Sequence, residues 1–95
     1  MPAPAAADSR FSEFLILQAQ NAGLFLGLIP NPFTGQPQIN LRAAQSVIDS
    51  LEMLVPKTRG NLTPQEAKLL SSAITHLRPL YQKARSEAGP PQPDL

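Results

Sequence analysis

Cysteine and tryptophan are absent from this 95-residue chain, and charged residues make up only 16% of it. The absence of cysteine excludes disulfides, thiolate zinc sites and cysteine nucleophiles. The net charge is +1, and the basic residues are scattered from Arg10 to Arg85. The sequence therefore lacks the basic block that is typical of proteins that bind nucleic acid tightly.

Histidine is also scarce, because His76 is the single one in the chain. Nucleophilic catalysis needs a base next to a nucleophile, and a lone histidine on the flank of a helix is more often solvated or hydrogen-bonded to a neighbour. Asp49, Glu52 and His76 are one conceivable set of metal ligands, but we expect Asp49 to bond to Arg78 or His76 instead. We therefore predict no catalytic residue, metal or cofactor, and no enzymatic activity.

The two ends of the chain differ in composition from its middle. Residues 1–8 and 88–95 are rich in proline and alanine or glycine, with almost no large apolar side chain, so we expect two disordered tails around one helical domain at 9–87. The start of the chain has no basic segment before its first apolar run, so we expect no signal peptide and a cytoplasmic location.

The first third of the sequence predicts a long apolar helix from Ser9 to Ile29, with Asp8 or Ser9 as its N-cap and Pro30 as its end. No charged residue occurs from Phe14 through Leu41. One broad apolar face can cover the other helices. A second stripe then remains outside, and it comprises Leu17, Leu24 and Leu28, with Gly23 and Gly27 beside it.

This second stripe predicts a surface for self-association, with the two glycines letting another backbone approach closely. We expect a homodimer or a larger oligomer, with another protein as a further candidate partner. The alternatives are that both stripes are used inside one chain, or that the helix attaches to a membrane surface. The apolar run is too short to cross a bilayer comfortably, and it lacks the lysines of an interfacial helix.

A proline-rich loop follows from Pro30 to Asn40, and its Phe33 is either a core residue or a docking residue. Asn40 is the expected N-cap of a second, amphipathic helix, which Pro56 should bend or end within its last turn. Next, Gly60 suits a left-handed position, with Leu62 as the accompanying apolar contact.

Thr63 and Glu66 form a capping box that starts a third helix, which Pro79 should kink. The short connection makes the second and third helices antiparallel neighbours. Lys57, Arg59 and Lys68 gather at this turn, which leaves a weak nucleic-acid contact as an alternative function.

Four motifs occur in order along the chain: P-x-P-x-T-G at 30–35, I-D-x-L-x-M-L at 48–54, K-T-R-G-N-L-T at 57–63 and L-R-x-x-Y at 77–81. With these motifs the chain resembles a bacterial family called domain of unknown function 1844, over roughly Phe11 to Tyr81. The resemblance implies a bacterial origin and brings no activity or functional residue with it.

Together these features predict an all-α, three-helix protein that assembles as an oligomeric helical bundle. We expect a non-enzymatic interaction or scaffold module that self-associates through its first helix.

Overall fold

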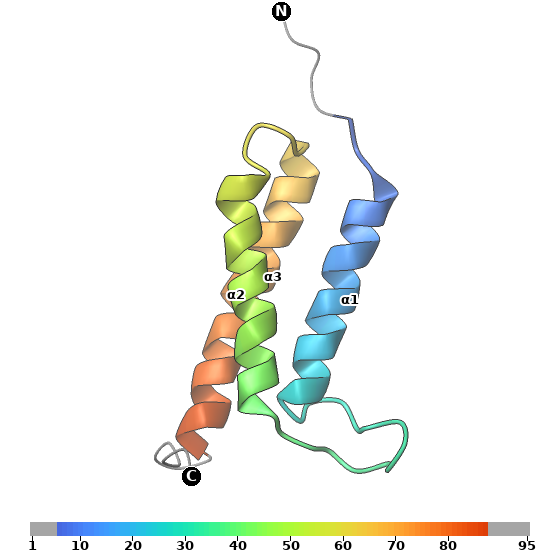
Figure 1. The fold of residues 1–95 in the computed structure, drawn as a ribbon, viewed down its shortest axis with the longest axis vertical. Coiled ribbons are helices and arrows are strands. Elements are labelled where there is room, and N and C mark those ends of the chain that lie inside the picture. Colours follow the sequence, from blue (N-terminus) through green and yellow to red (C-terminus); the bar gives the residue numbers. More distant parts are fainter. Residues whose placement is uncertain (1–5, 88–95) are drawn as a thin grey trace, which may run out of the picture.

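In the computed structural model the chain folds into three helices and the loops that join them (Figure 1). The helices are α1 (Ser9–Phe25), α2 (Leu41–Lys57) and α3 (Pro64–Glu87). The structure describes residues 6–87, so the tail predicted at 88–95 and most of the tail predicted at 1–8 lie outside the described residues. The all-α, three-helix prediction is confirmed.

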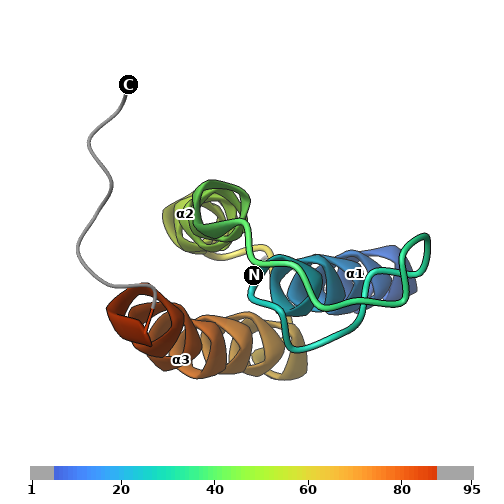
Figure 2. The ribbon, with the colours of Figure 1, turned by 90° about the horizontal axis from the view of Figure 1, so that it is seen from below.

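Helices α2 and α3 form an antiparallel hairpin, and α1 packs along it (Figure 1). Viewed from one end, the three helices form a triangle (Figure 2). Each helix has an apolar stripe that points to the centre of this triangle, because its apolar residues recur every three or four positions. The buried core is made of Leu15, Ala22, Leu26, Ala44, Val47, Ile48, Leu51, Leu70, Leu77 and Ala84.

The predicted helix starts are confirmed by their capping bonds. Asp8 caps α1 by accepting a hydrogen bond from the Arg10 amide. Asn40 caps α2, since its Oδ1 accepts the Ala43 amide hydrogen at an N–O distance of 3.0 Å. Thr63 and Glu66 form the capping box of α3, in which each side chain accepts from the other residue's amide. These bonds satisfy amides that the first turn of a helix leaves without partners.

The end of α1 differs from the prediction, because the helix stops at Phe25 and not at Ile29 before Pro30. Gly27 adopts a left-handed conformation with φ of 77°. The amide of Leu28 then donates to the Gly23 carbonyl, and the amide of Gly27 donates to the Leu24 carbonyl. This pair of bonds is a Schellman motif, which ends a helix without any proline.

The two helical prolines have different effects. Helix α2 ends at Lys57, one residue after Pro56, as predicted. Helix α3 continues through Pro79 to Glu87. Between α2 and α3, Gly60 has a positive φ of 86° and Leu62 packs against the core, as the sequence predicts.

Candidate interaction surfaces

Helix α1 and the start of the loop after it carry large apolar side chains that remain exposed. Leu17 is 52% exposed and Ile16 is 50% exposed, and the nearest charged residue along the helix is Glu13, one turn before them. We call this region the outer α1 surface and define it as Phe14, Ile16 and Leu17 of α1 with Leu28 and Ile29 of the loop that follows, all of which are exposed. Ile16 and Ile29 lie on its α3 side, where they line a shallow groove together with residues of α3. Exposed apolar side chains of this kind are candidates for contact with another molecule.

The predicted stripe is only partly exposed to solvent. Leu17 and Leu28 are exposed, whereas Leu24 is half-buried. Ile16 is also exposed, although it does not belong to the predicted stripe of Leu17, Leu24 and Leu28. The exposed surface is therefore broader than that stripe and is displaced from Leu24.

The two glycines of the prediction contact their own chain. Gly23 is buried, and a Cβ atom at this position would lie 3.1 Å from Cδ1 of Ile29. At Gly27 a Cβ atom would lie 2.9 Å from Cγ1 of Ile39. The space beside both glycines is thus occupied by isoleucine side chains from the loop after α1, so they do not open the helix to another backbone.

The loop between α1 and α2 is closed at its base and braced internally. A β-bridge joins Leu26 to Ile39, and the Asn40 amide donates to the Phe25 carbonyl at 2.6 Å. Inside the loop, Asn31 accepts the Phe33 amide hydrogen through Oδ1 at 2.8 Å and donates through Nδ2 to Gln38. An asparagine side chain that bonds two residues onward is an Asx turn.

This bracing leaves the aromatic ring of Phe33 in water, since the residue is 95% exposed. Phe33 is therefore no core residue. The loop holds it at a defined position on the surface.

The basic residues predicted at the second turn come from three different parts of the chain. Lys57 is the last residue of α2, Arg59 lies in the turn and Lys68 lies on α3, and all three are exposed. Of the three, only Arg59 lines a groove, which is described next.

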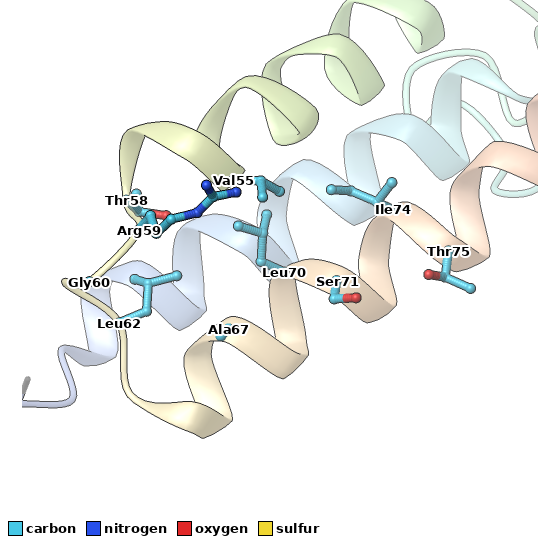
Figure 3. A pocket seen from close by; sticks show the side chains of 10 residues that line it. All are labelled: Val55, Thr58, Arg59, Gly60, Leu62, Ala67, Leu70, Ser71, Ile74 and Thr75. Carbon is cyan, nitrogen blue, oxygen red and sulfur yellow. The ribbon is translucent and has the colours of Figure 1, made fainter.

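A groove of about 340 Å³ lies between the end of α2 and the first half of α3 (Figure 3). We call it the α2/α3 groove. The sequence does not predict this groove, because the groove depends on the distance between two packed helices. Its lining is mostly apolar and consists of Val55, Thr58, Arg59, Gly60, Leu62, Ala67, Leu70, Ser71, Ile74 and Thr75.

The polar residues considered for catalysis or metal binding bond to other residues of the chain. The prediction that Asp49 bonds to Arg78 or His76 is wrong, because Arg78 pairs with Glu52 and Asp49 accepts from Gln45. His76 is exposed, and its Nδ1 lies 2.8 Å from the Ser72 carbonyl oxygen. Within residues 6–87 no three His, Asp or Glu side chains are placed to hold a metal ion.

Glu66 is the one charged residue among the buried residues of the described chain, with 4% of its surface exposed. Its carboxylate accepts hydrogen bonds from the Asp8 and Thr63 amides, both at 2.9 Å. These bonds favour the ionised form, so the backbone amide of Asp8, and then that of Thr63, hold the pKa of Glu66 below its ordinary value of 4.5. Glu66 therefore links the start of α1 to the start of α3.

Comparison with known proteins gives one match. A family model described as "Domain of unknown function (DUF1844)" matches residues 8–83. No curated protein and no solved structure matches the chain. Among the described residues, none of the helices is both long enough and apolar enough to cross a membrane.

Proposed function

Because this chain belongs to the DUF1844 family, whose description names no activity, we propose a function from its surface: it is a non-enzymatic interaction module that self-associates as a homodimer through the outer α1 surface. The observation that supports this proposal is the exposure of Ile16 and Leu17 on a helix that has no charge after Glu13. Burying such side chains against a second copy removes apolar area from water, at about 25 cal/mol per Å².

A symmetric pairing fits the position of these side chains. Leu17 is the middle residue of α1, which runs from Ser9 to Phe25. In a two-fold dimer with antiparallel α1 helices, the middle residues of the two copies meet at the axis, and a self-complementary patch closes without forming fibres. The hairpin then supplies a rigid frame behind each α1 helix.

The first test is the solution mass of the full chain, measured by light scattering over a wide concentration range. We expect a dimer for the wild type and a monomer for Leu17→Asp, because a buried unpaired carboxylate is costly. Leu17 is a better site than Leu24, because Leu17 is exposed whereas Leu24 is half-buried. Gln82→Asp is the matched control, since it places the same charge on an exposed position of α3.

A second test uses the absence of cysteine from the chain. In Leu17→Cys the new thiol is unique, and an antiparallel dimer places two such thiols together. We expect rapid disulfide formation at this position and slow formation in Gln82→Cys. A wild-type chain that stays monomeric at all concentrations overturns the proposal.

Two other outcomes point to the alternatives. A monomer that sediments with lipid vesicles, and loses this property in Leu17→Asp, indicates peripheral membrane binding. Salt-sensitive binding to nucleic acid that is lost when Lys57, Arg59 and Lys68 are replaced by glutamate indicates the basic turn.

A further inference from the structure

The α2/α3 groove has the size and lining of a site for a small molecule. Leu70, which is 2% exposed, lies beneath it, and Val55, Leu62 and Ile74 add apolar walls. Small-molecule sites are concave, measure about 300–1,000 Å³ and are mostly apolar with a few polar groups. The volume of about 340 Å³ is at the small end of that range, so the groove suits a small ligand.

The turn that contains Gly60 limits one end of the groove. Beyond Ile74 and Thr75 the concave surface continues along α3 past Arg78, which forms an ion pair with Glu52 of α2. A compact molecule needs only the stretch between the turn and Ile74.

Arg59 determines the charge of a ligand that fits. It is the one charged residue among those that line the groove, and its guanidinium lies over the end of the groove beside Val55 (Figure 3). Across residues 6–87, no carboxylate pairs with Arg59. The planar guanidinium matches the geometry of a carboxylate through two parallel hydrogen bonds.

We propose that the α2/α3 groove binds a small amphipathic carboxylate, in which an alkyl or aryl body carries one terminal carboxylate. The apolar body lies against Leu62, Leu70 and Ile74, and the carboxylate binds Arg59. No residue of α1 lines the groove, so this site is separate from the outer α1 surface and does not depend on self-association.

The test is a titration of the isotopically labelled full chain with octanoate, followed by the amide signals in NMR spectra. We expect saturable shifts of the Leu62, Leu70 and Ile74 signals. Octanol has the apolar body without the charge, and acetate has the charge without the body. Both should bind at least about tenfold more weakly than octanoate, because each loses one of the two kinds of contact.

Two variants make the test specific. Arg59→Gln should weaken octanoate binding about tenfold, since it removes a charge-assisted pair. Arg85→Gln removes one positive charge from an exposed position near the end of α3 and should leave the affinity unchanged. Both variants keep the core residues, so their spectra report binding and not unfolding.

The proposal is overturned if octanoate causes no saturable shift, or if octanol binds as tightly as octanoate. It is also overturned if Arg59→Gln binds octanoate normally, or if the shifts fall on the outer α1 surface. Repeating the titration with Leu17→Asp separates the two proposals, because that variant should keep the groove site whether or not the wild type forms a dimer.

Discussion

The backbone amide of Asp8 donates a hydrogen bond to the carboxylate of Glu66, at 2.9 Å and across 58 positions of sequence. Asp8 caps α1 and Glu66 caps α3, so one buried carboxylate fixes the start of one helix against the start of another. No short loop joins α1 to α3, so this hydrogen bond is a direct link between the starts of the two helices. The bond makes the packing of α1 depend on the charge of Glu66.

The first prediction concerns acid. Bonds from the Asp8 and Thr63 amides hold the pKa of Glu66 below 4.5, so the folded chain binds fewer protons at this group than the unfolded chain does. The stabilisation is complete above that ordinary value and is lost as the pH falls through the lowered folded-state pKa. We expect the urea midpoint to fall with pH in this window, and Glu66→Gln to show a flatter dependence.

The pKa of Asp8 is also lowered, so its contribution to the pH dependence needs a separate control variant. The hydrogen bond from the Arg10 side chain, together with that from its amide, lowers the pKa of Asp8 to about 2. Asp8→Asn keeps an N-cap side chain and removes this titration. A midpoint for Glu66→Gln that follows pH as steeply as the wild type would contradict the role given to the Glu66 carboxylate.

The second prediction compares two glycines with the same backbone conformation. Gly27 and Gly60 have φ of 77° and 86°, so alanine at either position costs about 1–2 kcal/mol of unfolding free energy. A Cβ at Gly60 meets open space, whereas one at Gly27 lies 2.9 Å from Ile39. We therefore expect Gly27→Ala to cost about 2–4 kcal/mol by denaturant unfolding. Equal losses would show that Ile39 moves away freely.

The third prediction separates exposure from burial. Phe33 is 95% exposed, so Phe33→Ala should change the free energy of unfolding by less than about 0.5 kcal/mol. Leu15 is 1% exposed, and Leu15→Ala should cost about 2–5 kcal/mol because it leaves a cavity. A large loss of stability in Phe33→Ala would mean that the ring packs against the protein in solution.

Features that depend on a few neighbouring residues could be predicted from the sequence. The caps at Asn40 and at Thr63 with Glu66 depend on side chains that reach amides within three residues. The end of α1 is also a local signal, carried by Gly27 and not by Pro30. In the structure the left-handed conformation of Gly27 ends the helix at Phe25, four residues before the predicted end at Ile29.

Features that depend on how the helices rotate and tilt could not be predicted. Asp49 and Glu52 are three positions apart on α2, and the tilt of α3 decides that Glu52 pairs with Arg78. The link from Asp8 to Glu66 and the α2/α3 groove have the same origin. The burial of Leu24 also depends on how α1 is rotated, because the periodicity of α1 does not fix which side faces the hairpin.

The bridge between Leu26 and Ile39 has a consequence for how this protein can vary. Because the bridge fixes the base of the loop, residues 32–37 at its tip can be added or removed without changing the distance between α1 and α2. Lengthening a closed loop costs little, about 0.6 kcal/mol for each doubling. The segment around Phe33 can therefore change in length and sequence while the packing of the three helices stays the same.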